Sequence, residues 1–331
     1  MLNTFSKILL LVIFIPQFLQ AQLIPIEETE LSEMTGQAFI NIDHSSNADN
    51  SLDFTKLTLG LDVKTLLTSD MLELGNYTRD GKAGSDIKIN DFALGMIDDD
   101  GKIIPFEIKD PFIELAFEDV DGKQNLAGVR LGFNGASGKL TGNIESLTGN
   151  INVNIVGRAA PIREAASEGF WGPGRVLLLS AAGVSDNTQL RAAAELVQSN
   201  GQANPVRSTS VGIPNGDVLG CESGCNLGGL SNFLLGLFGS SNCAVLGITT
   251  CFPLSSYKSL DIGTTGADAE GLFLSFQTKA ITWYDNGAPT STVKGAFFNI
   301  PNGGITVNFE EAFKGTDRVR TRYIDPYFGG H

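Results

Sequence analysis

An alternation of apolar and polar side chains constrains the fold of this chain more than any other feature of its sequence. Within residues 54–63, Leu57, Leu59 and Leu61 alternate with polar or small residues, which is the period of a strand that buries one face. Further runs of strand length occur at 38–43, 87–97, 103–108, 112–117, 272–283, 293–300 and 305–309. The sequence therefore predicts a mainly β fold.

Turn sequences separate these runs. The tripeptide Asp-Gly-Lys begins at Asp80, Asp100 and Asp121. Asp-Gly favours two-residue hairpin turns, because both central residues need positive φ angles, which Gly adopts freely and Asp tolerates. Residues 285–287 and 301–304 have the composition of turns between the C-terminal strands. We expect antiparallel hairpins that form a sandwich or a solenoid-like sheet.

The acidic turns also allow a calcium-binding interpretation. Residues 98–100 and 118–121 supply carboxylate oxygens, which are the ligands that Ca²⁺ prefers. Neither group shows the alternating acids and closing Glu of an EF-hand loop. We favour ordinary hairpin turns and keep calcium binding as the alternative.

A helical insert is predicted in the middle of the chain. Ser185 or Asp186 can cap a helix over 189–198, a segment rich in Ala, Leu and Glu, and Asn200 with the following Gly would end it. Residues 201–217 contain Gly, Pro and Ser and resemble a linker. The predicted organisation is a β-rich region at 22–160, a helical insert and linker at 161–217, and a cysteine-containing β-rich region at 218–331.

The four cysteines of the chain, Cys221, Cys225, Cys243 and Cys251, lie within 31 residues. In an exported protein such a local, even-numbered set predicts two disulfides, with three possible pairings. Zinc is the alternative, although the spacing matches no standard zinc motif. The segment 227–238 between them is strongly apolar. We expect a short helix packed on the core there, or else an exposed apolar surface for a partner.

The N-terminus predicts export. Lys7 is the only charged residue among the first 26, and it precedes an uninterrupted apolar run at 8–15. This run is shorter than the roughly 20 residues of a membrane-spanning helix, and a small-residue cleavage site precedes Gln22. We therefore expect a signal peptide over 1–21 and a mature chain without a transmembrane segment. The cell surface or the medium is the expected location, with the periplasm as the alternative.

Charge and histidine content narrow the function. The formal net charge of −14 disfavours binding to nucleic acids and to anionic membrane surfaces, because both would repel the chain. His44 and His331 are the only histidines, and the sequence has no nucleophile elbow, zinc-protease motif or phosphate-binding glycine loop. We therefore expect a protein that is not an enzyme and that needs no cofactor or metal.

A repeated segment suggests a surface for strand addition. Leu-Thr-Gly-Asn-Ile occurs at 140–144 and again at 147–151, followed by alternation up to residue 156. Since 152–156 has neither charge nor proline to protect an edge, one interpretation is a solenoid or an edge strand that contacts a partner, although we favour a meander for the strands themselves. The candidate contact residues of such an edge are Ile144, Ile151, Val153 and Ile155. The meander would lie inside a closed sandwich.

Residues 30–40, Glu-Leu-Ser-Glu-Met-Thr-Gly-Gln-Ala-Phe-Ile, resemble the opening of exported proteobacterial proteins of the Fil type, described as pilus assembly proteins. Two further segments, 129–138 and 146–151, are similar to a central region of the same group. The resemblance covers about 40 residues and implies a role in a pilus or surface fibre. It carries no catalytic residues.

These observations lead to one expected function and one alternative. We expect a structural protein of the cell surface that contacts pilus or fibre proteins, or its own copies. Its N-terminal strand would dock on the partner through Gly36, Gln37, Phe39 and Ile40. The alternative is a periplasmic or outer-membrane-associated binding protein for a lipid or another apolar ligand, with 227–238 as the wall of its site.

Overall fold

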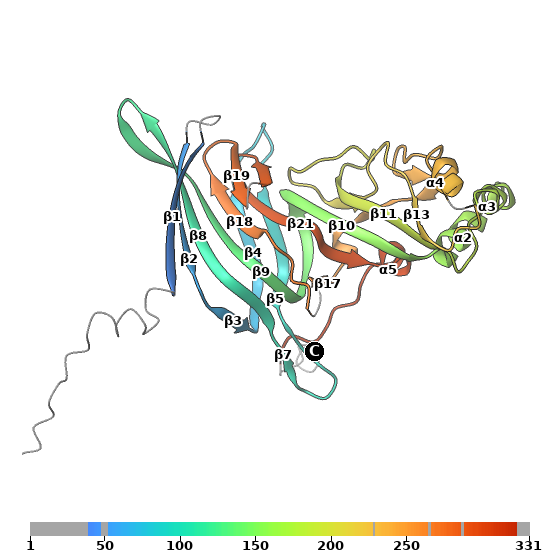
Figure 1. Cartoon of the computed structure of the whole chain (residues 1–331), viewed down its shortest axis with the longest axis horizontal. Helices are drawn as coiled ribbons and strands as arrows, with labels where there is room; N and C mark the ends of the chain where they lie inside the picture. Colours follow the sequence, from blue (N-terminus) through green and yellow to red (C-terminus); the bar gives the residue numbers. More distant parts are fainter. Residues whose placement is uncertain (1–38, 48–51, 228, 264–265, 286–287, 323–331) are drawn as a thin grey trace, which may run out of the picture. The chain divides into compact units, whose positions relative to one another are not determined.

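The computed structural model describes residues 39–47, 52–227, 229–263, 266–285 and 288–322 (Figure 1). Residues 38–331 cluster as one compact unit. Most strands join one 15-stranded sheet, and the described part also contains three small two-stranded sheets and a few short helices. The mainly β fold with antiparallel hairpins is therefore confirmed, as are a small helical insert and a disulfide-bonded segment.

The first part of the large sheet begins at β1 and continues in the order β2, β8, β9, β18 and β21. Its hairpin between β8 and β9 is the longest in the chain, and Asp121 and the following Gly form its turn with positive φ angles of 56° and 76°. The strands are β1 (Ile40–Asn47), β2 (Leu52–Leu59), β3 (Asp62–Thr65), β8 (Phe106–Val120), β9 (Lys123–Leu147), β18 (Leu272–Gln277) and β21 (Gly295–Val307).

The second half of β9 pairs with other strands than the first half does. Its residues 140–147 pair with β5, and residues 138–141 also pair with β17. The strands of this part are β4 (Leu67–Asn76), β5 (Ser85–Leu94) and β17 (Ser259–Ile262). The β4–β5 hairpin contains the predicted turn at Asp80, where φ is 50°. The turn with Asp100 joins β6 (Met96–Ile97) to β7 (Ile103–Ile104). The predicted two-residue turns are therefore confirmed at Asp80 and Asp121, whereas at the third site only the Gly after Asp100 has a positive φ and the loop from 98 to 102 is longer.

A third part of the sheet lies around β10, which pairs in parallel with β21 and antiparallel with β11. Helices lie beside the strands of this part in Figure 1. The strands are β10 (Gly149–Arg158), β11 (Gln189–Val197), β12 (Ser210–Gly212), β13 (Gly220–Ser223) and β16 (Cys251–Pro253). The helices are α2 (Ala160–Ser167), α3 (Gly172–Ala181), α4 (Gly229–Leu235), α5 (Phe309–Lys314) and the 3₁₀ turn η1 (Leu254–Ser256). Two small hairpins complete the described fold, β14 (Ala244–Val245) with β15 (Ile248–Thr249) and β19 (Ile281–Asp285) with β20 (Ala288–Thr292).

The predicted helix over 189–198 is wrong, because these residues form strand β11. Leu190, Ala192, Ala194 and Leu196 are buried, so the segment follows a period of two. The high helix propensity of Ala, Leu and Glu hid this period, and pairing with β10 on one side and β12 on the other overrides the propensity. The helices of the insert lie earlier, in α2 and α3, each with a proline in its first turn.

Two other expectations about connections are also wrong. Residues 301–304 do not reverse the chain, since they lie inside β21, where Gly303 has a φ of 79° and the pairing with β10 shifts register. The predicted linker 201–217 contains β12, which pairs with β11 and with β16. The three predicted regions therefore share one sheet instead of being separated at a linker.

A buried ion cluster fixes the β19–β20 hairpin on one face of the first part of the sheet. Arg130, on β9, is fully buried, and its Nε donates to Glu114 Oε2 at 2.7 Å while its Nη1 donates to Asp285 Oδ2 at 2.7 Å. The guanidinium also lies 5.2 Å from the ring of Trp283, which is itself fully buried. This face of the sheet is therefore buried in the core, and only the opposite face is accessible to a partner.

Candidate interaction surfaces

Strand β1 lies at the end of the large sheet and pairs only with β2 among the described residues. The N–H of Gly60 donates to the carbonyl of Phe39, so odd-numbered residues of β1 bond to β2. The backbone groups of Ile40, Ile42 and His44 consequently point away from β2. Along its length, β1 presents a row of backbone donors and acceptors that a further strand can pair with.

The predicted contact residues of the N-terminal strand are only partly described. Phe39 and Ile40 precede and begin β1, and both side chains are exposed, as expected for contact residues. Gly36 and Gln37 lie outside the described residues.

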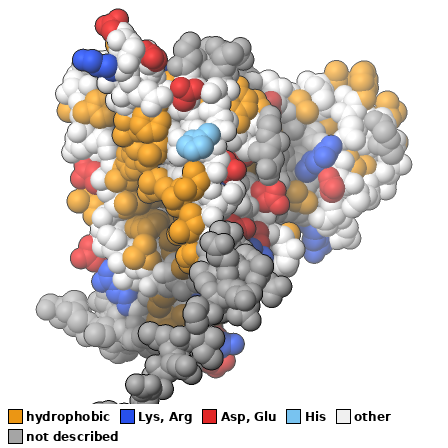
Figure 2. Space-filling view, turned by 60° about the vertical axis from the view of Figure 1, so that its left-hand side comes forward, with side chains coloured by type: hydrophobic (Ala, Val, Ile, Leu, Met, Phe, Trp, Pro, Cys, Tyr) orange, Lys and Arg blue, Asp and Glu red, His pale blue; other side chains and the backbone are white. Residues whose placement is uncertain are grey.

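One face of the first part of the sheet is apolar across several strands. Directly paired residues of an antiparallel sheet point to the same side, and the row Ile42, Leu57, Ile113, Leu131 and Leu274 runs across β1, β2, β8, β9 and β18. We define the apolar face as the following residues of these strands: Ile40, Ile42, Leu57, Leu59, Ile113, Leu115, Val129, Leu131, Leu274 and Phe276. Figure 2 shows hydrophobic side chains gathered on this side of the molecule.

Exposure of the apolar face is greatest at β1. Leu274 and Phe276 pack against the main core, whereas Leu131 is 42% exposed and Ile42 is 55% exposed. A shallow groove of about 340 Å³ lies beside Val129 and Phe276. The face thus leads from the core to a strand whose described side chains are all exposed. Exposed contiguous apolar surface of this kind is typical of interaction sites.

The predicted edge strand at 144–155 is wrong. Ile144 lies on β9 paired with Ile89 of β5, and Ile151, Val153 and Ile155 lie on β10 between β11 and β21. All four side chains are buried. The absence of charge and proline in this segment reflects an interior strand instead of an unprotected edge.

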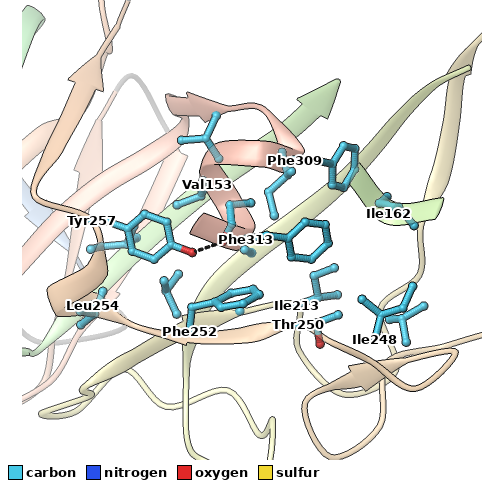
Figure 3. Close-up of a pocket in the computed structure, with 18 of the residues that line it drawn as sticks. Val153, Ile162, Ile213, Ile248, Thr250, Phe252, Leu254, Tyr257, Phe309 and Phe313 are labelled. Atoms are coloured by element: carbon cyan, nitrogen blue, oxygen red, sulfur yellow. Dashed lines mark hydrogen bonds between the residues drawn. The ribbon is translucent and has the colours of Figure 1, made fainter. Parts of the chain in front are cut away.

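These four residues line an apolar cavity instead of a surface (Figure 3). The cavity measures about 50 Å³ and is closed by Phe309 and Phe313 of α5 and by the side chain of Tyr257. The hydroxyl of Tyr257 donates to the carbonyl of Ala312 at 2.6 Å, and burial raises the pKa of this tyrosine well above its usual value. Sites for drug-sized ligands measure about 300–1,000 Å³, so this space is a packing defect of the core.

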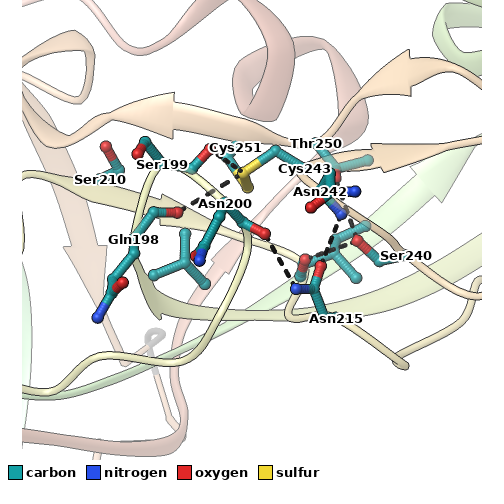
Figure 4. The surroundings of a disulfide bond; sticks show 12 residues. Gln198, Ser199, Asn200, Ser210, Asn215, Ser240, Asn242, Cys243, Thr250 and Cys251 are labelled. Carbon is teal, nitrogen blue, oxygen red and sulfur yellow. Dashed lines mark hydrogen bonds between the residues drawn. A yellow bond between two sulfur atoms is a disulfide. The ribbon is translucent and has the colours of Figure 1, made fainter.

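The cysteines form the two disulfides that the sequence predicted, and the structure selects the pairing of neighbours. Cys221 is bonded to Cys225 and Cys243 to Cys251, with Cα–Cα distances of 6.4 and 5.1 Å. The second bond holds β16 beside the 198–201 turn, where Asn215 Nδ2 donates to the carbonyl of Asn200 at 2.9 Å (Figure 4). No cysteine remains free for zinc.

The expectation that segment 227–238 is a short helix packed on the core holds for α4 at Leu235, whereas most apolar side chains of the segment are exposed. Leu235 is buried, but Leu230, Phe233 and Leu237 are exposed, as is Leu227. None of them lines the apolar cavity. The other interpretation of this segment, an exposed apolar surface, is the one that the geometry matches.

The described residues contain neither a cluster of metal ligands nor a membrane-spanning helix. No group of three or more His, Cys, Asp or Glu side chains there could hold a metal ion. No helix in the same residues is long and apolar enough to cross a membrane.

Sequence reasoning did not find the apolar face, although one pattern indicates it. In 112–117 apolar residues occupy both faces of the strand, with Phe112 and Ala116 on one side and Ile113 and Leu115 on the other. A strand that is apolar on both faces is usually covered on both. Here one cover is the β19–β20 hairpin, and the other side stays partly exposed.

Comparison with protein families, with curated proteins and with solved structures finds no match to this chain.

Proposed function

We propose that this protein is an exported structural component of the cell surface that joins a pilus or fibre by adding a partner's strand to β1. The observation that carries the proposal is the continuity between the apolar face and the unpaired edge of β1. A partner strand at this edge gains backbone hydrogen bonds and at the same time extends an apolar surface that needs cover.

The energetics favour contact with a protein segment. Ile40 and Ile42 are about half exposed, and burial of such side chains contributes roughly 25 cal/mol per Å² of apolar surface. The backbone bonds of an added strand contribute further, since each net bond is worth about 0.5–1.5 kcal/mol. Backbone pairing and apolar burial therefore act together at this edge, against the entropy that association costs.

Export supports the same proposal. The apolar run at 8–15 after Lys7 has the length of the apolar region of a signal peptide. Two disulfides are typical of an oxidising compartment. Ligand binding in the apolar cavity is less favoured, because about 50 Å³ is too small for a lipid.

Replacing Ile42 with proline tests the proposal. Ile42→Pro removes an N–H that points away from β2, so it blocks strand addition but leaves the β1–β2 bonds in place. We expect the variant to fold, with an unchanged melting temperature within a few degrees, and to lose label on surface filaments in immunogold microscopy and from sheared high-mass material.

The matched control is Asn41→Ser, which changes the opposite face of the same strand and keeps the outward backbone groups. This variant should assemble like the wild type. If Ile42→Pro folds and assembles normally, strand addition at β1 is excluded. A protein found only as a periplasmic monomer would contradict the surface role itself.

A further inference from the structure

A second exposed apolar surface lies on and beside helices α3 and α4. It shares no strand and no residue with the apolar face. Phe170 and Trp171 precede α3 and are 89% and 71% exposed, which is exceptional for aromatic side chains of this size. Leu177 and Leu178 of α3 are exposed as well. With the exposed residues of the 227–238 segment they form the helical patch, defined as Phe170, Trp171, Leu177, Leu178, Leu227, Leu230, Phe233 and Leu237.

A backbone hydrogen bond connects the two parts of the helical patch, one at α3 and one in segment 227–238. The N–H of Asn226 donates to the carbonyl of Gly183 at 3.1 Å, which ties the end of α3 to the start of α4. Figure 1 shows α3 and α4 next to each other, beside β13. The side chain of Asn232 in α4 accepts from the N–H of Cys221 at 2.6 Å, and the Cys221–Cys225 disulfide closes the same loop.

Each helix is held by buried residues on its inner side. Leu179 of α3 and Leu235 of α4 are each 1% exposed and belong to the main core. Exposed apolar residues on the outer side are therefore presented by fixed helices, and their exposure does not come from missing core contacts. A protein maintains such a surface at a cost in solubility only where something covers it.

The helical patch is almost free of charge. No Asp, Glu, Lys or Arg occurs in the 35 residues from 223 to 257, although these types make up 18% of the chain. Between 169 and 185 the single charged residue is Arg175, whose Nη1 donates to the carbonyl of Glu168 at 3.3 Å. Charge is thus absent from the patch residues themselves, and the nearest acidic residues along the chain, Glu168, Asp186 and Glu222, are exposed at its borders.

We propose that the helical patch docks on the interface of a lipid bilayer. Helices satisfy their own backbone hydrogen bonds, so they can enter a region without water, which the open edge of β1 cannot do. Trp, Phe and Leu are the residues that interfacial helices bury among the headgroups. The patch residues themselves carry no charge, which fits the boundary between headgroups and acyl chains.

The docking is shallow and needs no anionic lipid. Neither α3 nor α4 can span a bilayer, so the aromatic and leucine side chains reach the boundary between headgroups and acyl chains. The negative net charge repels anionic lipids, and a patch without acids allows contact with zwitterionic ones. This inference does not depend on strand addition at β1, and each surface can be tested without the other.

Intrinsic fluorescence gives a direct test. The chain has two tryptophans, of which Trp171 is exposed and Trp283 is fully buried, so added lipid changes the signal of Trp171 alone. We expect phosphatidylcholine vesicles to shift the emission to shorter wavelength and brominated phosphatidylcholine to quench it. The mature full-length chain should also float with these vesicles in a density gradient.

Substitutions in the helical patch distinguish specific lipid docking from nonspecific adsorption to vesicles. Leu177→Asp and Phe233→Asp place a charge at exposed sites, and each should lower vesicle binding by about tenfold or more without unfolding the chain. The matched control is Leu126→Asp on β9, which is also exposed but lies on a strand whose main contacts include neither helix, and should bind as the wild type does.

Two results would overturn the proposal. One is the absence of flotation and of any Trp171 shift at millimolar phosphatidylcholine. The other is self-association or capture of a protein that depends on Leu177 and Phe233 while vesicles are ignored, since this would assign the helical patch to a protein interface. Binding that is equal in the Leu177→Asp, Phe233→Asp and Leu126→Asp variants would likewise exclude the patch as the docking site.

Discussion

At the scale of single residues, Arg130 connects strands β8 and β9 of the sheet to the β19–β20 hairpin. Its guanidinium is surrounded by the rings of Phe112, Phe273 and Trp283 and is bonded to two carboxylates, one on β8 and one on β19. A buried ion pair of this kind is costly to break, because the remaining charge loses its partner without regaining water. The cluster therefore holds the hairpin on the sheet as long as both partners are present.

Arg130→Met should lower the free energy of unfolding by about 3–5 kcal/mol, since it leaves Glu114 buried without its partner. The double variant Arg130→Met with Glu114→Leu should recover much of this loss. Urea denaturation followed by tryptophan fluorescence measures both. Equal stability of the single and double variants would show that Glu114 regains solvent when Arg130 is absent.

Glu114 also makes stability depend on pH. Burial raises the pKa of its carboxyl above the usual 4.5, against the opposing effect of Arg130. The folded protein then binds this proton more tightly than the unfolded chain does. The contribution of Glu114 to stability is therefore fully present below about pH 4.5 and is lost as pH rises through the raised folded pKa. Relative to Glu114→Gln, the wild type should lose stability over this window in urea titrations. A parallel pH dependence of the two proteins would contradict the raised pKa.

At the scale of elements, the disulfides stabilise a region with little regular structure. Cys243 and Cys251 flank the small β14–β15 hairpin, and Cys251 begins β16, which forms one end of the large sheet. A short edge strand has pairing on one side only, so a covalent link restricts its departure from the sheet. The same region carries α4, and its rigidity supports the helical patch.

Replacing Cys243 and Cys251 by Ser should lower the free energy of unfolding by about 2–3 kcal/mol, the value expected for a closed loop of this length. Thermal unfolding of the oxidised wild type, the double variant and the reduced wild type measures the effect. The reduced wild type should lose at least as much as the variant does, because both bonds are then open. An unchanged melting temperature would mean that β16 needs no covalent restraint.

At the scale of the whole molecule, one sheet connects regions of very different protection. Strand β10 lies between two neighbours and its Ile151, Val153 and Ile155 side chains are buried, whereas β1 has one neighbour among the described strands and exposed side chains throughout its described part. Local opening costs least where few apolar contacts hold a segment. A sheet that resists local opening at β10 and opens more easily at β1 fits a protein that adds strands at one end.

Amide hydrogen exchange should show this gradient. We expect the protected amides of β10 to exchange on the order of a hundredfold more slowly than those of β1, because β1 can open without the rest of the sheet. Mass spectrometry of peptides covering 40–47 and 149–158 measures the two rates. Equal protection of the two strands would show that β1 opens only with global unfolding.

The sequence by itself determined the class of fold, the hairpin turns and the presence of two disulfides. These features depend on neighbours in the chain, since Asp121 with its glycine makes a turn and Leu57 with its alternating neighbours makes a strand wherever they lie. Export stays a prediction, which also depends on the sequence alone because a signal peptide is recognised before folding.

Only the tertiary structure decided which strands are edges and which apolar residues are exposed. Residues 189–197 and 149–158 pair with segments far along the chain, and that pairing overrides helix propensity in the first and covers the predicted edge of the second. The exposure of Phe233 and Trp171 likewise depends on where α3 and α4 pack. An apolar side chain has the same sequence signature in a core and on a docking surface, and only long-range contacts distinguish the two.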